Sequence, residues 1–348
     1  KPIHKGGLIG EIMDEKVTIS DIAREVGVSK TTISRYLNGS YGYMSDKTRR
    51  RIEQVIEQTG YVPNNVARTL RSKKSNLIGV VVNTLRYQVG AQTVTGIQDV
   101  CNKYGYGTVV CCSDDDPDKE LEAIQLCQNQ QVDGFIIIPC LEKSNRYIEL
   151  CQRGTPVVLC TRRLTDWPYG CVYVKHEEMI GQMMVHLKEQ GFEKVQFLLD
   201  VNNFHKRRMG DAFAQRAKEL FDMEPDESIA LVGRKDPKIP EALDQFKAKW
   251  VGTRKAVMAV NTHTLFLTLQ ELERRGCHIP EDIGVCGYDA QGWAELVSPG
   301  ISAIRQPMDQ MGIQAAEELM AALAENRMSQ NHVALSGKVF FRDSTKRN

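Results

Sequence analysis

Four closely spaced hydrogen-bond donors near the amino end are the most distinctive chemical feature of the sequence. In a helix that begins after Ser29, the apolar residues Ile33, Tyr36 and Leu37 share one face. The donors share the opposite face, and they are Lys30, Thr31, Ser34 and Arg35. Such a cluster suits a polyanion, and DNA offers both phosphate and base-edge acceptors. An ordinary solvated helix face is the alternative.

Two short helices joined by a tight turn would position these donors. Apolar residues recur at positions i, i+3, i+4 and i+7 from Ile19, after a possible amino-terminal cap at Thr18. Gly27 is expected to end this first helix, and Ser29 can cap the second. The pattern is typical of a helix-turn-helix unit, in which the second helix enters the major groove.

A third helix is predicted from Ser45 to Gln58, with Ile52, Val55 and Ile56 as its apolar stripe. Basic residues lie on or near its outer face, namely Lys47, Arg49, Arg50 and Arg51. Three short helices would form a small headpiece. This favours DNA binding over a solvated helix pair.

Charge is unevenly distributed along the 348 residues. Residues 1–76 contain 14 Lys and Arg against 8 Asp and Glu, whereas the remainder contains 31 against 36. A basic end is thus joined to an acidic body, as expected when only one end meets nucleic acid. The length is too great for one ordinary domain and suggests two or three.

The amino-terminal quarter resembles the signature of the lactose-repressor family of bacterial transcription regulators. It carries VTISDIAREVGVSKTTISRYLNG and then SDKTRRRIEQVIEQTGYVPNNVARTLRSKKSNLIGVVV, and a looser resemblance continues through the rest of the chain. The resemblance implies four parts, which are an amino-terminal extension over 1–16, a helix-turn-helix headpiece over 17–62, a hinge over 63–75 and an effector-binding and dimerisation core over 76–348.

The resemblance also assigns DNA contacts. The family's base-reading positions fall on Lys30, Thr31 and Arg35. Arg35 can contact guanine through two hydrogen bonds, Lys30 can donate to O6 or N7, and Thr31 can touch a thymine methyl. Hydroxyls, an ammonium group or helix amino termini suit phosphates at six further residues, which are Thr18, Ser29, Ser34, Ser45, Lys47 and Thr48.

Residues 63–75, PNNVARTLRSKKS, are too short and too polar to form a stable helix alone. We therefore expect this segment to be disordered until DNA orders it. By the resemblance it is a hinge whose helix forms on operator DNA and inserts Leu70 into the minor groove, with Asn64 and Ala67 beside it. A plain linker with a helical tendency is the alternative.

Beyond residue 76, near-continuous apolar runs typical of strands buried on both faces alternate with helical segments. The runs are LIGVVV, TVVCC, GFIII, PVVL, CVYV, KVQFLL, SIALV, AVMAV and IGVCG, with VFF near the end. We predict an α/β core of two lobes with parallel sheets and a ligand cleft at the strand ends. The resemblance extends to periplasmic sugar-binding proteins. It places lobes at about 77–174 with 306–332, and 175–303 with 333–348.

Five residues are candidates for binding a small-molecule effector between the lobes, and they are Asn83, Arg162, Arg207, Asn261 and Asp289. The family's R-x-x-G element falls on Arg207 and Gly210, its strand-end asparagine on Asn261 and its strand-end aspartate on Asp289. Asn83 follows the first strand, and Arg162 stands in the family's D-R position. A surface salt bridge for Arg207 and a helix cap for Asp289 are the alternatives.

Where the sequence departs from the family pattern, acidic residues are lost or replaced by basic ones at the expected cleft. Thr161 replaces an acid, and Lys175–His176 stands where the family has Asp-Asn. With Arg162 and Arg207, these residues would attract an anion such as a sugar acid or a phosphorylated sugar. CCSDDDPDKE resembles the branch of the family that senses sugar acids. Exposure of Lys175 and His176 to solvent is the alternative.

Other classes of protein are disfavoured. No apolar run approaches the ~18–20 residues of a membrane span, and residues 1–16 lack the apolar core of a signal peptide, so a cytoplasmic protein is expected. Ten cysteines without a C-x-x-C pair indicate buried reduced thiols. No Walker, H-E-x-x-H or G-x-S-x-G motif occurs, so we expect no catalytic residues, metal or cofactor.

The sequence thus predicts a sequence-specific DNA-binding transcriptional regulator that represses a carbohydrate or sugar-acid operon. Its expected partners are double-stranded operator DNA, a sugar, sugar acid or sugar phosphate as effector, and a second copy of the chain, with higher assembly open. Two alternatives remain. One is a global carbon regulator whose core docks a phosphorylated carrier protein, and the other is a sugar-binding receptor that does not bind DNA.

Overall fold

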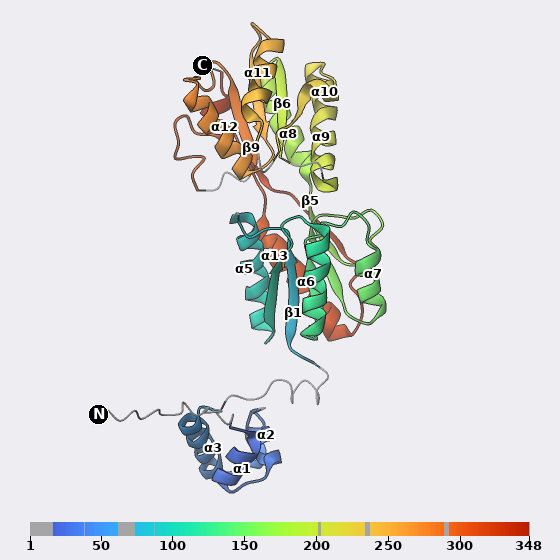
Figure 1. The fold of residues 1–348 in the computed structure, drawn as a ribbon, viewed down its shortest axis with the longest axis vertical. Coiled ribbons are helices and arrows are strands. Elements are labelled where there is room, and N and C mark those ends of the chain that lie inside the picture. Colours follow the sequence, from blue (N-terminus) through green and yellow to red (C-terminus); the bar gives the residue numbers. More distant parts are fainter. Residues whose placement is uncertain are drawn as a thin grey trace, which may run out of the picture. The chain divides into compact units, whose positions relative to one another are not determined.

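A computed structural model describes residues 17–37, 39–61, 74–86, 88–200, 203–233, 237–288 and 292–347. The chain divides into two compact units between Lys73 and Lys74, and each is described by itself (Figure 1). Four candidate site residues lie outside the described ranges, namely Asn64, Ala67, Leu70 and Asp289, as does the segment 1–16. The roles predicted for them stay predictions.

The amino-terminal unit is a small helical bundle. Its elements are α1 (Ile19–Val26), α2 (Lys30–Leu37), the 3-10 helix η1 (Tyr41–Tyr43) and α3 (Asp46–Thr59). Ile22, Ile33 and Ile52, one from each α-helix, are fully buried at its centre. The three predicted helices are therefore confirmed, and η1 is an element that hydrophobic periodicity did not predict.

Local signals fix the ends of these helices. Thr18 is the amino-terminal cap of α1, and Ser45 Oγ accepts the backbone N–H of Thr48 at 3.2 Å at the start of α3. Gly27 and Gly60 end α1 and α3 with φ of 78° and 60°, a conformation that costs glycine little. The turn between α1 and α2 is thus set by residue types that the sequence shows directly.

Six parallel strands form the first sheet of the core, in the order β11-β5-β4-β3-β1-β2. Their bounds are β1 (Leu77–Val82), β2 (Gly107–Cys112), β3 (Gly134–Ile137), β4 (Val157–Thr161), β5 (Cys171–Val174) and β11 (His332–Leu335). One face carries α5 (Gln88–Lys103) and α13 (Met308–Glu325), and the other carries α6 (Pro117–Asn129) and α7 (Asn145–Gln152). Ile78 and Val80 of β1 pack on the first face and Val81 on the second, which explains the near-continuous apolar run.

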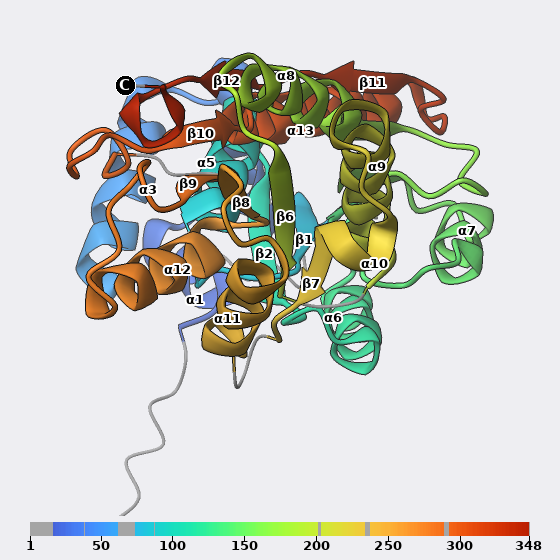
Figure 2. The same ribbon diagram turned by 90° about the horizontal axis from the view of Figure 1, so that it is seen from above.

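The second sheet has the order β12-β10-β9-β8-β6-β7, parallel except for β12 against β10. Its strands are β6 (Lys194–Leu199), β7 (Ile229–Leu231), β8 (Lys255–Ala259), β9 (Gly284–Tyr288), β10 (Ser302–Arg305) and β12 (Lys338–Phe340). Its helices are α8 (His176–Glu189), α9 (Phe204–Phe221), α10 (Pro225–Ser228), α11 (Ile239–Lys249), α12 (Thr262–Arg274) and the 3-10 helix η2 (Asp343–Thr345). They flank this sheet, with α9 against β6 and α12 against β8 and β9 (Figure 2).

The chain passes between the two sheets three times. It leaves the first sheet after β5, returns after β10 and leaves again after β11. The expectation that residues 333–348 belong to the second lobe is wrong for Val333–Leu335, because β11 pairs with β5 in the first sheet. The last crossing therefore falls between β11 and β12. Periodicity could not reveal this, since both short strands are half-exposed at a sheet edge.

Helix α13 returns to the first lobe and packs tightly on α5. A Cβ atom on Gly312 would lie 2.1 Å from the carbonyl oxygen of Thr93, and one on Gly96 would lie 2.5 Å from that of Asp309. Backbone atoms cannot move aside for a side chain at either position. The close approach of these two helices therefore depends on glycine and holds the returning segment in the first lobe.

All ten cysteines are free thiols. Six are buried, as predicted, but Cys112 is exposed at the end of β2. Burial raises the pKa of Cys101 and of Cys151 to about 11, so both stay protonated at neutral pH. In the described part of the chain, no helix combines the length and apolarity needed to cross a bilayer.

Candidate DNA-binding surface and effector cavity

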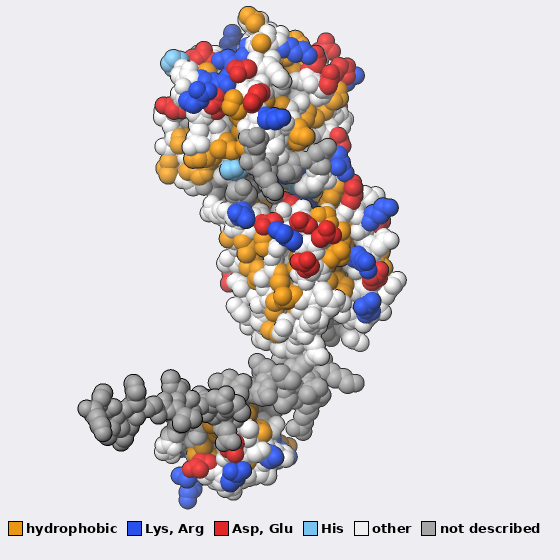
Figure 3. Space-filling view, in the orientation of Figure 1, with side chains coloured by type: hydrophobic (Ala, Val, Ile, Leu, Met, Phe, Trp, Pro, Cys, Tyr) orange, Lys and Arg blue, Asp and Glu red, His pale blue; other side chains and the backbone are white. Residues whose placement is uncertain are grey.

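The side chains predicted to read bases lie together on the exposed side of α2. Lys30 and Thr31 are exposed in its first turn and Arg35 in its last, whereas Ile33 between them is fully buried. Basic side chains are visible on this unit's surface in Figure 3, interspersed with acidic ones. The arrangement provides donors at both ends of one exposed face.

Most hydroxyls predicted to meet phosphates take part in helix caps. Thr18 Oγ1 donates to Asp21 at 2.6 Å, and Ser29 Oγ accepts the backbone N–H of Thr32 at 3.1 Å. Ser45 Oγ lies 2.9 Å from Thr48 Oγ1. The two other members of this set are the half-buried Ser34 and the exposed Lys47. A phosphate at these helix ends would meet backbone N–H groups and already oriented hydroxyls.

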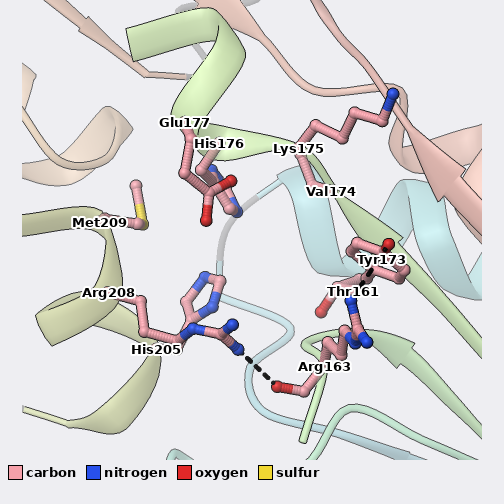
Figure 4. Close-up of a pocket in the computed structure, with 10 residues that line it drawn as sticks. All are labelled: Thr161, Arg163, Tyr173, Val174, Lys175, His176, Glu177, His205, Arg208 and Met209. Carbon is pink, nitrogen blue, oxygen red and sulfur yellow. Dashed lines mark hydrogen bonds between the residues drawn. The ribbon is translucent and has the colours of Figure 1, made fainter. Parts of the chain in front are cut away.

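A cavity of about 270 Å³ opens between the two lobes of the core. The first lobe contributes Thr161, Arg163, Tyr173 and Val174, and the second contributes Lys175, His176, Glu177, His205, Arg208 and Met209 (Figure 4). The two groups meet where β5 ends and α8 begins. Residues from both lobes thus share one cavity at a crossing between them.

Among the described residues of this lining, cationic groups dominate, with Arg163, Lys175 and Arg208 against the carboxylate of Glu177. Arg208 Nη1 donates to the backbone carbonyl of Arg163 at 3.0 Å, which links α9 to the turn after β4. The Arg163 guanidinium lies 5.2 Å from the centre of the Tyr173 ring. The cavity therefore offers a positive environment that suits a carboxylate or phosphate ligand.

Two histidine rings complete the lining, with centroids 5.0 Å apart. Burial, aided by Lys206, Arg162 and Arg208, lowers the pKa of His176 to about 3. Burial likewise lowers the pKa of His205 well below its usual value. Both rings are neutral at pH 7. His176 Nδ1 lies 3.3 Å from the Tyr288 hydroxyl, and its buried Nε2 has no hydrogen-bond partner among the described atoms.

Two predicted effector residues are engaged elsewhere. Arg162 is 4% exposed, pairs with Asp115 at 2.6 Å and donates to the Pro139 carbonyl at 2.9 Å. Arg207 is exposed and pairs with Glu142 at 2.5 Å, which is the salt bridge that the sequence left as an alternative. Their neighbours, Arg163 and Arg208, line the cavity instead.

The two asparagine candidates are also absent from the described lining of the cavity. Asn83 is half-buried after β1, and its backbone carbonyl accepts the N–H of Asp115 at 3.1 Å. Asn261 caps α12 by accepting from Thr264 at 2.9 Å, and it donates to Asp200 at 2.7 Å. Of the residues singled out from the sequence, the cavity gathers Thr161, Lys175 and His176. Sequence reasoning missed Arg163, His205 and Arg208, although each adjoins a predicted residue or motif.

Comparison with known proteins decides the family. Residues 18–64 match the bacterial regulatory proteins of the lacI family, and residues 184–345 match a periplasmic binding protein-like domain. The chain is 30% identical over 322 residues to the probable HTH-type transcriptional regulator EndR of Paenibacillus polymyxa, covering 92% of this chain and 94% of that protein. The chain belongs to the lacI family. It is a DNA-binding transcriptional regulator, as the sequence predicts.

Further relatives agree with this assignment. The HTH-type transcriptional regulator KdgR of Bacillus subtilis (strain 168) is 28% identical over 94% of this chain and 97% of its own. Among solved structures, the lac repressor dimer bound to operator and the anti-inducer ONPF matches with a TM-score of 0.82 at 22% identity, over 95% of this chain and 100% of that chain. The predicted headpiece and two-lobed core are therefore confirmed as the lac repressor fold.

Proposed function

We propose that this lacI-family regulator is a dimeric repressor of a carbohydrate or sugar-acid operon, controlled by an anionic small molecule bound between the core lobes. The observation that carries the choice of an anion is the trio of Arg163, Lys175 and Arg208 around one cavity. A neutral sugar would form no ion pair with these three groups. The lac repressor, whose fold the chain shares, forms a dimer on its operator, and this supports the proposed assembly.

The cavity geometry suits a ligand that carries a carboxylate or phosphate and hydroxyl groups. Guanidinium groups bind such anions through paired hydrogen bonds. The first turn of α8 begins at His176, so its backbone N–H groups also favour an anion there. The unpartnered Nε2 of His176 can exchange a hydrogen bond with a ligand hydroxyl or oxyanion.

Contacts across the lobes suggest how such a ligand would act. Arg208 reaches the Arg163 carbonyl, and Arg207 reaches Glu142, so two neighbouring residues of α9 join the second lobe to the first. A ligand that competes for or reinforces these contacts would bind one lobe arrangement more tightly than another. That difference in affinity shifts the populations of the two arrangements and thereby changes the fraction of the protein that is in the DNA-binding arrangement.

Ligand class is tested by thermal unfolding of the full chain with gluconate, galacturonate and glucose 6-phosphate, each beside its neutral parent sugar. A specific anion at a hundred times its Kd should stabilise the protein by about 2.7 kcal/mol, and the neutral sugar should not. The variant Arg208→Gln should lose this stabilisation by the anion, because the substitution removes one of the three cations of the cavity. Stabilisation by a neutral sugar and by none of the anions would refute the proposal.

Base readout is tested with Arg35→Ala and Lys47→Ala. If Arg35 contacts a guanine, its loss should cost about 1–3 kcal/mol on the native site and relax selectivity at one base pair per half-site. Lys47→Ala should weaken binding to all DNA sequences alike and reduce the salt dependence of binding, because a phosphate contact carries no sequence information. Unchanged affinity and selectivity in Arg35→Ala would exclude its assigned role.

A further inference from the structure

Two exposed tyrosines lie in η1, the short element between α2 and α3. Tyr43 is 81% exposed and Tyr41 is 39% exposed. Each ring nevertheless has an arginine partner from a neighbouring helix. The Arg35 guanidinium lies 5.0 Å from the centre of the Tyr43 ring, and that of Arg49 lies 4.1 Å from the centre of the Tyr41 ring. Both separations are within the range of a cation–π interaction.

The η1 turn is firmly attached to α2. Backbone N–H groups of Gly39 and Ser40 donate to the carbonyls of Tyr36 and Arg35 at 3.0 and 2.9 Å. The Tyr41 ring meets the half-buried Tyr36 ring edge to face, with centroids 5.7 Å apart. Tyr41 therefore anchors the turn to the bundle. This anchoring fixes the backbone from which Tyr43 projects.

Arg35 is the side chain to which base readout has been assigned, and a free arginine on a surface samples many rotamers. Ordering it on DNA costs conformational entropy. A ring beneath the guanidinium restricts those rotamers before DNA arrives. A guanidinium that stacks on a ring by its flat face keeps its N–H donors, which lie in its plane, available for the two acceptors of a guanine.

We propose that Tyr43 is a positioning residue for sequence readout, holding Arg35 in an orientation suited to a base edge. The inference rests on the proposed readout by Arg35 and adds a residue outside the helix-turn-helix pair. The aromatic ring of Tyr43, and not its hydroxyl group, holds the Arg35 guanidinium in this orientation. Tyr43 should therefore influence selectivity at the base pair that Arg35 reads and leave phosphate contacts unchanged.

The test compares Tyr43→Ala with Tyr43→Phe in the full chain. The probes are a duplex that the native chain selects from random-sequence DNA and the same duplex altered at the base pair read by Arg35. Tyr43→Ala should weaken binding to the selected duplex about two- to fivefold, and it should have little effect on the altered duplex. Tyr43→Phe keeps the ring and should bind as the native chain does. The salt dependence should be the same for all three proteins.

A double-mutant cycle separates this inference from the proposed function. If Tyr43 acts through Arg35, Tyr43→Ala should add nothing in an Arg35→Ala background. If Arg35→Ala weakens binding to the selected duplex and Tyr43→Ala does not, the inference is overturned and the proposed readout stands. If Arg35→Ala does not weaken binding, the proposed readout itself is overturned. Equal losses in Tyr43→Phe and Tyr43→Ala, with a reduced salt dependence, would mean that the hydroxyl contacts phosphate and would also overturn the inference. Thermal unfolding of both variants checks that the bundle is intact, as the exposure of Tyr43 leads us to expect.

Discussion

Replacing Arg162 with methionine is expected to lower the free energy of unfolding of the core by about 3–5 kcal/mol. Arg162 and Asp115 form an ion pair at 2.6 Å, and their side chains are only 4% and 7% exposed. The substitution removes the ion-pair contact of Arg162 with the buried Asp115 carboxylate and also the donor to the Pro139 carbonyl. Breaking one side of such a pair costs more than the pair contributes, because the remaining charge has left water.

The matched control for this experiment is Arg163→Met, which removes the same charge one residue away. Arg163 is exposed at the cavity, so its loss should cost less than about 1 kcal/mol in stability. Urea unfolding of both variants without ligand measures the difference, and calorimetry measures anion binding. We expect Arg162→Met to lose stability and Arg163→Met to lose anion affinity. An Arg162→Met protein of native stability would restore Arg162 as a ligand-binding candidate.

Sequence patterns predicted the framework because its causes are local. The stripe that starts at Ile19, the caps at Thr18 and Ser45 and the turn at Gly27 each depend on residues within one or two helical turns. In β1, Ile78 and Val81 pack on opposite faces of a sheet that helices cover on both sides. An unbroken apolar run is then enough to predict the strand.

The cavity was predicted only approximately because side-chain direction depends on tertiary structure. Thr161 has a φ of 65°, which a β-branched residue rarely adopts, and after it Arg162 lies in the interior and Arg163 at the cavity. Arg207 and Arg208 are successive residues of α9 and so point about 100° apart around the helix axis. The R-x-x-G motif locates this turn of the helix, but the packing of α9 decides which arginine faces the cavity.

The η1 tyrosines escaped prediction for a different reason. Three residues are too few for periodicity, and the segment YGY bears none of the donors first sought for DNA contact. Their significance appears only when Arg35 and Arg49, from two different helices, are seen over their rings. Interactions between separate elements of this kind have no signature in a single sequence.

Affinity for an anionic effector is expected to increase as the pH falls, because we expect His176 to have a higher pKa in the complex than in the free protein. Below the pKa of His176 in the complex, each fall of one pH unit should raise the affinity by up to about tenfold. In the free protein, burial and nearby cations hold the pKa of His176 at about 3, so the ring is neutral. A bound anion favours the imidazolium form and raises that pKa. Binding would then take up a proton, and lower pH would favour the complex.

Several charged or titratable groups surround this ring and determine how large the effect is. Those that line the cavity or act on the ring are Arg162, Arg163, Lys175, Glu177, His205, Lys206, Arg208 and Tyr288. Among these described groups the cations outnumber the carboxylate of Glu177, so the free protein opposes protonation of His176. In the ligand-free protein, unfolding lets His176 bind the proton that the native state excludes. Stability should therefore decrease as the pH falls below about 6.5, the ordinary histidine pKa.

Calorimetry between about pH 5 and about pH 8, in buffers of different ionisation enthalpy, measures both affinity and proton uptake. A sugar carboxylate that stays ionised over this range is the suitable probe, because a phosphate monoester would titrate itself near pH 6. His176→Gln should flatten the dependence on pH, whereas His278→Gln, which changes an exposed histidine outside the cavity, should retain it. If the native protein bound the anion equally at every pH, or if His176→Gln kept the native slope, protonation of His176 would play no part in binding. A steep slope lost only in His176→Gln would instead make the cavity a sensor whose response to an acidic sugar strengthens as the pH falls.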